Sequence, residues 1–250
     1  MSTEALSTRG VDKRFGSLLV AKDINLTLPQ GVRYALIGPN GAGKTTLINL
    51  ITGMLKPDGG KIFLAGEDVT GLEPQARVKR GLARTFQINS LFPELNALEA
   101  IALCVCERRG LAHTWWRNLK RYPEAMEEGY QILQSLSLEK VCYRKTRELA
   151  YGQQRLLEIA LALATRPRVL LLDEPAAGVP KEESGELFSA IESLSQDITI
   201  LFIEHDIDIV FRFASRILVL VSGCILVEGS PEEIAADSRV REVYLGETRG

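Results

Sequence analysis

Apolar and polar residues alternate near the start of the chain. Within residues 21–28, Ile24, Leu26 and Leu28 are apolar and the residues between them are polar. This period of two predicts a half-buried strand in an antiparallel sheet. Four later runs are almost continuously apolar, as in strands that are covered on both faces. They span residues 34–37, 169–172, 198–203 and 217–221, and we expect them to form a central parallel sheet.

Helical patterns separate these apolar runs. Residues 44–55, 153–165 and 182–195 have helical spacing, so strands and helices alternate as in a layered α/β domain. The stretch from residue 89 to residue 164 is instead almost entirely helical in pattern. No linker rich in Gly, Ser or Pro divides the chain. We therefore predict one domain, residues 1–250, with a helical subdomain inserted at residues 89–164.

Composition and charge narrow the class of protein. The chain is 46% hydrophobic and 25% charged, with a formal net charge of −2, which is typical of a globular domain. So small a charge gives no general attraction for nucleic acid, and we expect no such partner. Residues 1–10 lack a signal peptide's apolar stretch, and no run approaches the roughly 18 apolar residues of a membrane helix. The sequence predicts a cytoplasmic protein.

A glycine-rich segment follows the apolar run at residues 34–37. Residues 38–45, GPNGAGKT, match the pattern GxxxxGK[ST] between a predicted strand and a predicted helix. Backbone N–H groups of such a loop surround phosphate oxygens, Lys44 neutralises the outer phosphates, and Thr45 offers a hydroxyl to Mg²⁺. The predicted phosphate site consists of Gly38, Asn40, Gly41, Ala42, Gly43, Lys44, Thr45 and Thr46.

Two carboxylates follow the apolar run at residues 169–172. Asp173 ends this predicted strand, where its carboxylate can reach Mg²⁺ held over the phosphate loop. Glu174 lies one residue further, where it can orient and polarise a water molecule as a general base. The alternative for Glu174 is a helix N-cap before Pro175. Together these motifs predict an ATPase that uses MgATP.

The order of further motifs resembles the ABC ATPase family. Gln87 in RTFQ resembles the glutamine that contacts Mg²⁺ and water in this family, residues 149–154 (LAYGQQ) resemble its signature motif, and His205 resembles its switch histidine. The resemblance implies a phosphate-loop, RecA-like α/β core with an N-terminal antiparallel β subdomain and an inserted α-helical subdomain. Taken alone, Gln87 and His205 have an ordinary reading as loop or core polar residues.

The resemblance also assigns roles to residues outside the phosphate loop. Ala150, Gly152 and Gln153 of the signature would contact the γ-phosphate of ATP that a second subunit binds, and His205 would contact that of the chain's own ATP. Phe15, 29 residues before Lys44, resembles the aromatic residue that stacks on adenine, although a core position is the alternative.

Two positions depart from the family pattern. Ala150 stands where many relatives have a serine, so one hydroxyl contact to phosphate is missing, and we expect slower hydrolysis. Pro180 stands where an Asp or Asn is usual, which puts polar contacts across the dimer in doubt.

Within the family, the sequences at residues 84–87, 150–154, 204–206 and 244–246 are most similar to ATPases of branched-chain amino-acid uptake systems, and urea and amide importers share much of this pattern. The implied partners are membrane permeases, a second and related ATPase, and indirectly a periplasmic solute-binding protein, with this chain on the inner face of the membrane. The alternatives are an ATPase of the lipopolysaccharide-export kind and a non-transport ABC protein.

Overall fold

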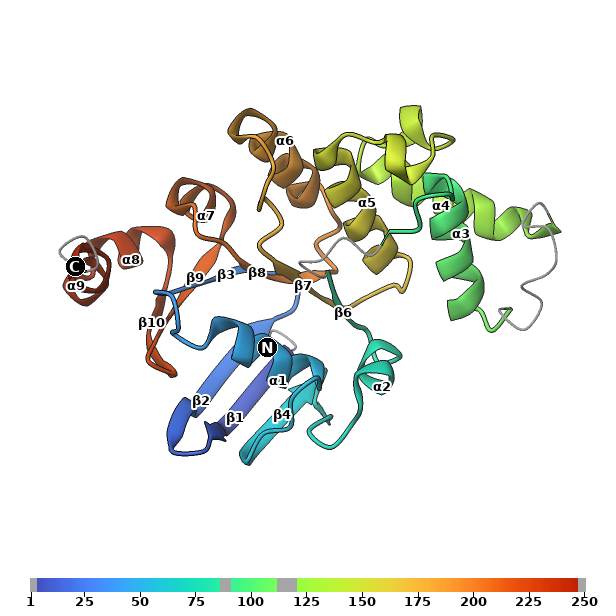
Figure 1. Cartoon of the computed structure of the whole chain (residues 1–250). Helices are drawn as coiled ribbons and strands as arrows, with labels where there is room; N and C mark the ends of the chain where they lie inside the picture. The colour runs from blue at the N-terminus through green and yellow to red at the C-terminus, as the bar shows by residue number, and fades with distance from the viewer. Residues whose placement is uncertain (1–3, 86–90, 112–120, 247–250) are drawn as a thin grey trace. The chain divides into compact units, whose positions relative to one another are not determined.

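In the part of the chain that the computed structural model describes, residues 4–85, 91–111 and 121–246, the strands form two sheets (Figure 1). The chain divides into two units, which are described separately. Unit 1 comprises Met1–Leu82, Arg168–Glu174 and Gln196–Gly250, and unit 2 comprises Ala83–Pro167 and Pro175–Ser195.

The N-terminal sheet of unit 1 is antiparallel and has the order β2-β1-β4-β5. Its strands are β1 (Glu4–Phe15), β2 (Leu18–Pro29), β4 (Gly59–Leu64) and β5 (Glu67–Asp68). The alternating segment at residues 21–28 lies in β2, with Ile24, Leu26 and Leu28 buried. The predicted antiparallel β subdomain is therefore confirmed, although the sequence pattern had indicated one of its four strands.

The second sheet has the order β10-β9-β3-β8-β7-β6. Its strands are β3 (Arg33–Ile37), β6 (Leu82–Arg84), β7 (Val169–Asp173), β8 (Thr199–Ile203), β9 (Arg216–Val221) and β10 (Cys224–Gly229). The four predicted central strands correspond to β3, β7, β8 and β9, which pair in parallel, whereas β10 is antiparallel to β9. Their positions agree with the expectation that continuous apolar runs are covered on both faces.

The helices of unit 1 are α1 (Lys44–Thr52), α2 (Pro74–Val78), α7 (Ile207–Phe213), α8 (Pro231–Ala236) and α9 (Ser238–Gly246). One core cluster joins α1 to both sheets: it contains Leu47 of α1, Ile24 of β2 and Leu201 of β8. Burial of α1 on several sides holds in place the loop that precedes it.

The predicted helix at residues 44–55 is too long, because α1 ends at Thr52. Gly53 adopts φ 80° as the C-cap, and its N–H donates to the carbonyl of Leu50 at 3.2 Å. A Cβ atom on Gly53 would lie 2.8 Å from Nε of Arg77. Glycine thus ends the helix by the left-handed conformation that favours it, and a buried arginine lies directly against it.

Unit 2 is mostly helical. Its helices are α3 (Ala97–Arg108), α4 (Pro123–Ser135), α5 (Tyr151–Leu163) and α6 (Lys181–Glu192), with short 3-10 helices at Glu139–Val141 and Thr146–Glu148. The helices predicted at residues 153–165 and 182–195 correspond to α5 and α6, and both start and end earlier than predicted. Residues 89–164 remain the predicted range of the inserted subdomain; unit 2 contains this range and also α6.

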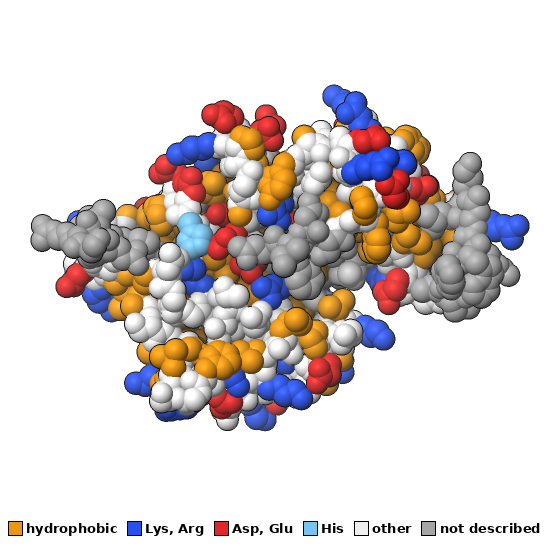
Figure 2. Space-filling model, viewed as in Figure 1, with side chains coloured by type: hydrophobic (Ala, Val, Ile, Leu, Met, Phe, Trp, Pro, Cys, Tyr) orange, Lys and Arg blue, Asp and Glu red, His pale blue; other side chains and the backbone are white. Residues whose placement is uncertain are grey.

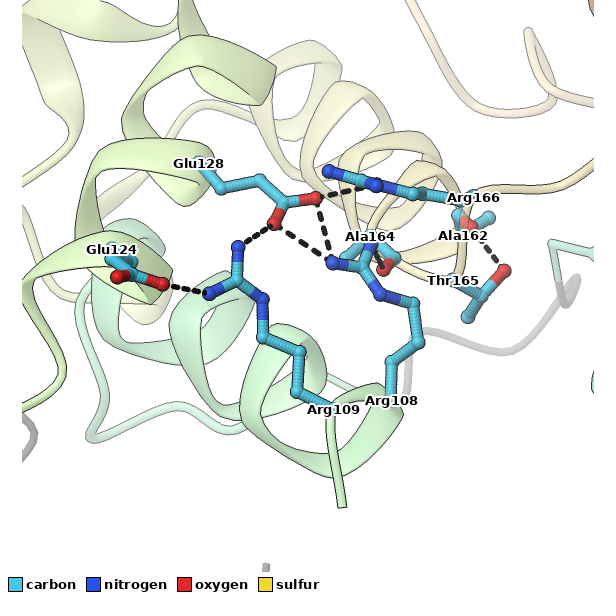
Figure 3. A network of polar contacts seen from close by, with 8 residues as sticks. All are labelled: Arg108, Arg109, Glu124, Glu128, Ala162, Ala164, Thr165 and Arg166. Carbon is cyan, nitrogen blue, oxygen red and sulfur yellow. Dashed lines mark hydrogen bonds and ion pairs between the residues drawn. The ribbon is translucent and has the colours of Figure 1, made fainter. Parts of the chain in front are cut away.

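A partly buried carboxylate connects α4 to the C-terminal ends of α3 and α5 in unit 2 (Figure 3). Glu128 of α4 accepts hydrogen bonds at 2.8 Å from Arg108, the last residue of α3, and from Arg109, which follows it, and at 2.9 Å from Arg166, which follows α5. Burial alone would raise the pKa of Glu128, but the hydrogen bonds from Arg108 and Arg109 outweigh it and lower that pKa. Arg108 also donates to the carbonyl of Ala164, just after α5, at 2.8 Å. The network fixes the C-terminal end of α5.

On the face shown in Figure 2, positively and negatively charged side chains are interspersed, and apolar side chains also reach the surface. Among the described residues, no helix is both long enough and apolar enough to span a bilayer. Large apolar side chains that are exposed include Phe15, Met54, Phe92 and Tyr143.

Candidate nucleotide site

The predicted phosphate loop lies between β3 and α1, as its motif requires. Gly38 and Gly43 have φ values of 153° and 103°, which side chains rarely adopt. A Cβ atom at Gly38 would lie 2.0 Å from the carbonyl oxygen of Leu220, and one at Gly43 would lie 2.6 Å from that of Val20. These two glycines therefore let the loop pass directly against the neighbouring backbone of unit 1.

Lys44 is the first residue of α1 and is 7% exposed. Its Nζ donates to the carbonyl oxygens of Gly38 at 2.6 Å and Pro39 at 3.0 Å. These bonds hold the positive charge at the loop itself. Because the helix N-terminus adds its own partial positive charge, the loop has the electrostatics of a phosphate site.

The other residues predicted at the phosphates surround this lysine in the chain. Ala42 is buried, and its carbonyl accepts a hydrogen bond from the N–H of Gly223 at 2.9 Å. Asn40, Gly41 and Thr45 are exposed, and Thr46 is partly buried. The loop is thus anchored through Ala42, whereas the hydroxyl-bearing Thr45 is open to solvent.

The two candidate carboxylates lie at the carboxyl end of β7. Asp173 is the last residue of the strand and is 6% exposed. Glu174 leaves the strand with φ 47°, and its N–H donates to the carbonyl of Ile203 on β8 at 3.1 Å. A left-handed conformation is uncommon for glutamate. It turns the chain sharply at this residue, so that consecutive carboxylates occupy different surroundings.

His205 follows β8 and meets Glu174. Its Nε2 lies 2.8 Å from Oε1 of Glu174, and the two side chains are 50% and 24% exposed. Because β7 and β8 are adjacent and parallel, their carboxyl ends bring both residues to one edge of the sheet. The sequence motifs named both residues but not their contact, which depends on strand order. A carboxylate beside an imidazole suits proton transfer and the orientation of water.

The donors predicted for Mg²⁺ suit a hard cation. Thr45 supplies a hydroxyl at the start of α1 and Asp173 a carboxylate at the end of β7, and oxygen ligands are those that Mg²⁺ prefers. Among the described residues, no group of three or more His, Cys, Asp or Glu could hold a metal. Two protein oxygens fit an ion whose remaining ligands are water and substrate phosphates, which is the usual arrangement for Mg²⁺.

The predicted signature motif begins α5 in unit 2. Ala150 is the N-cap residue, and its N–H donates to Oε1 of Gln153 at 3.1 Å. Gly152 is buried, and a Cβ atom there would lie 2.9 Å from Oε2 of Glu183. The motif thus starts a helix, as the resemblance implies, and its glycine lies close to the side chain of Glu183 in the same unit.

The signature motif contains a contact that the sequence did not reveal. The hydroxyl of Tyr151 lies 3.1 Å from the carbonyl oxygen of Ala177 and 2.8 Å from Nη2 of Arg155. Helical spacing brings Tyr151 and Arg155 to one face of α5, but nothing local predicts that residue 177 lies there. This contact joins the signature to the segment that follows Glu174 and Pro175.

Phe15 and Gln87 are also predicted to belong to the site, and the structure describes only the first of them. Phe15 ends β1 with a ring that is 52% exposed, and Nζ of Lys13 lies 5.8 Å from its centroid. It is therefore not a core residue, and its role at adenine stays a prediction. Gln87 lies outside the described residues, so its predicted contact with Mg²⁺ and water also stays a prediction.

Two protein families match parts of this sequence. A family described as ABC transporter matches residues 21–177, and one described as branched-chain amino acid ATP-binding cassette transporter matches residues 224–249. The high-affinity branched-chain amino acid transport ATP-binding protein BraF of Pseudomonas aeruginosa is 40% identical, and the alignment covers 99% of this chain and 100% of BraF.

Solved structures show the same fold. The ADP conformation of MJ1267, an ATP-binding cassette of an ABC transporter, has a TM-score of 0.85 and 34% identity, covering 97% of this chain and 99% of that one. The dimeric structure of MJ0796, a bacterial ABC transporter cassette, has a TM-score of 0.74 and 25% identity. The match covers 90% of this chain and 98% of that one.

Proposed function

The chain belongs to the ABC transporter family as one of its ATPase subunits, and we propose that it drives the import of branched-chain or other hydrophobic amino acids. The match at residues 224–249 carries the choice of solute, since this segment lies beyond the motifs that ABC ATPases share. It favours amino-acid import over the two alternatives from the sequence, a lipopolysaccharide-export ATPase and a non-transport ABC protein.

In this proposal each residue of the site has a defined role. The loop's N–H groups and Lys44 bind the ATP phosphates, while Thr45 and Asp173 hold Mg²⁺, which neutralises charge on the phosphates when bound. Glu174 positions and deprotonates the attacking water. His205 holds the carboxylate of Glu174 through the 2.8 Å contact and reaches the γ-phosphate as the resemblance implies. Gln87 completes the site.

Uptake measurements test the proposed solute. Cells that lack this chain are expected to lose most of their high-affinity uptake of labelled leucine, and the native chain should restore it. A Lys44→Ala variant should not restore it, because the phosphates lose their charge partner. Uptake of a labelled sugar serves as the control. Unchanged leucine uptake together with lost urea or amide uptake would overturn the choice of amino acids.

A complete ATP site needs two subunits in this proposal. The phosphate loop belongs to unit 1 and the signature motif to unit 2 of the same chain, and the similarity to a cassette with a dimeric structure supports a shared site. The signature around Gly152 would close the ATP held by a second ATPase. Resemblance to amino-acid uptake systems favours a related, non-identical partner over a symmetric dimer.

Light scattering tests the shared site. The Glu174→Gln variant is expected to be monomeric without nucleotide and to gain mass with MgATP, because ATP joins two surfaces and is not hydrolysed. The gain should be larger when the second ATPase of the same system is added. MgADP is the control: with MgADP the Glu174→Gln variant should keep the mass of a monomer. Constant mass under every condition would contradict a shared site.

The remaining partners lie at the membrane. We place the chain in the cytoplasm, bound to the inner face of the membrane through permease subunits and served indirectly by a periplasmic solute-binding protein. Phe92, which precedes α3, is 63% exposed, whereas Leu91 and Leu95 are partly buried. An exposed aromatic side chain five residues after Gln87 in the sequence suits contact with a short permease helix.

A further inference from the structure

The first turn of α5 is tied to the segment Ala176–Pro180 by a tyrosine. A guanidinium group donates hydrogen bonds and accepts none. Since Nη2 of Arg155 lies 2.8 Å from the hydroxyl of Tyr151, that hydroxyl is the acceptor in this bond. Its own proton is then directed to the carbonyl of Ala177, at 3.1 Å. Both bonds have a defined direction.

Arg155 is itself held in place. It is 5% exposed, its Nη1 forms an ion pair with Oε2 of Glu158 at 3.0 Å, and its guanidinium lies 5.1 Å from the ring centroid of Tyr151. Its Nη2 also lies 3.3 Å from the carbonyl oxygen of Ala177. A buried, paired side chain has little rotational freedom, so Arg155 fixes the position of the tyrosine hydroxyl.

The backbone at Gly178 packs closely against the side chain of Tyr151. Gly178 has φ 78°, and a Cβ atom there would lie 3.0 Å from the hydroxyl oxygen of Tyr151 and 3.1 Å from Cε1 of its ring. The ring therefore lies directly against the backbone at residue 178. A movement of the first turn of α5 must move this backbone with it, or break the hydrogen bond to Ala177.

The two ends of this contact serve different ATP molecules, if the proposed shared site is correct. Tyr151 is next to Gly152, which would close the ATP of the second subunit. Ala177 is three residues after Glu174, which would act on the ATP bound by this chain. Tyr151 is 41% exposed, so it is not a core residue. Such a link can report closure at one site to the base of the other.

We propose that Tyr151 is a positioning residue that couples the two ATP sites of the dimer through its hydrogen bond to Ala177. The inference rests on the proposed function, because it requires a shared site. In the absence of the hydroxyl, each site would still bind ATP, but closure at one site would no longer align Glu174 at the other.

The Tyr151→Phe variant of the full-length chain removes only the hydroxyl. Binding of a fluorescent ATP analogue by the monomer is expected to stay unchanged, because the phosphate loop keeps its residues. The maximal hydrolysis rate should fall about tenfold, as for loss of one hydrogen bond to a charged network, and the Hill coefficient for ATP should fall towards one. Tyr143→Phe, at a tyrosine that is 76% exposed in the same unit, is the matched control and should match the native chain.

A Gly178→Ala variant tests the contact from its other side. Its added Cβ atom should displace the Tyr151 ring, lower the Hill coefficient and add little to the effect of Tyr151→Phe in a double variant. Thermal unfolding of each variant checks the fold. If Tyr151→Phe is too unstable to assay, Gly178→Ala alone decides: native rate and Hill coefficient would overturn the proposal.

A measurement of dimer formation distinguishes failure of this proposal from failure of the proposed function. Glu174→Gln and Glu174→Gln/Tyr151→Phe are both expected to gain mass with MgATP, because ATP still joins the two surfaces. If neither gains mass, the shared site fails, and the coupling fails with it. If both do, but Tyr151→Phe hydrolyses ATP at the native rate with the native Hill coefficient, only the role of Tyr151 is refuted.

Discussion

Replacing Glu174 with glutamine is expected to lower ATP turnover by roughly 10²–10⁴-fold, the usual scale for loss of a general base. Glutamine has nearly the same shape and can still accept a hydrogen bond from Nε2 of His205, which lies 2.8 Å from the carboxylate. It cannot take a proton from water at neutral pH. The geometry of the site should therefore persist while its chemistry is lost.

The measurement is phosphate release at saturating MgATP, with ATP affinity determined separately. Affinity should stay close to the native value, because Lys44 and the phosphate loop are unchanged. Glu182→Gln, at an exposed glutamate in the first turn of α6, is the matched control and should hydrolyse ATP at the native rate. A Glu174→Gln variant with native turnover would show that another group activates the water.

Replacing Arg77 with methionine is expected to lower the free energy of unfolding by about 3–5 kcal/mol, because several buried acceptors lose their donor at once. Arg77 is 1% exposed and donates to the carbonyls of Leu50 at 2.8 Å and Ile51 at 2.6 Å, which end α1. It also donates to the carbonyls of Thr70 at 3.0 Å and Leu72 at 3.1 Å.

Methionine keeps an unbranched apolar chain of similar reach, so the loss is mainly one of hydrogen bonds rather than of packing. Urea denaturation followed by circular dichroism measures the change. Arg80→Met is the matched control, since Arg80 forms an ion pair with Glu67 at 2.7 Å near the surface and such pairs contribute up to about 1 kcal/mol. Equal effects of the two substitutions would refute a special role for Arg77.

The arginine also bears on function through α1. Lys44 and Thr45 occupy the first turn of this helix, whereas Arg77 satisfies carbonyls at its last turn. The last carbonyls of a helix have no partner within it. Arg77 of α2 supplies these donors, and so holds the C-terminal end of the helix whose N-terminal end is predicted to bind phosphate.

The sequence by itself was enough to predict those parts of the site whose residues are neighbours in the chain. Strand, glycine-rich loop and helix are contiguous at residues 34–52, and the hydrogen bonds from Lys44 to the carbonyls of Gly38 and Pro39 arise within that stretch, so its pattern predicts a phosphate site directly. Asp173 and Glu174 are recognisable for the same reason, because they end an apolar run that is long enough for a buried strand. Most errors in this local reading are at helix ends, where Gly53 stops α1 three residues early.

Only the tertiary structure decided which of these residues meet. Glu174 contacts His205 because β7 and β8 are neighbours in the sheet, and 31 residues separate the two in the chain. Arg77 reaches carbonyls 26 and 27 residues earlier, and Tyr151 reaches Ala177, 26 residues later. Such contacts depend on strand order and on how the helices pack, because periodicity within one segment specifies which face is buried but not what covers it.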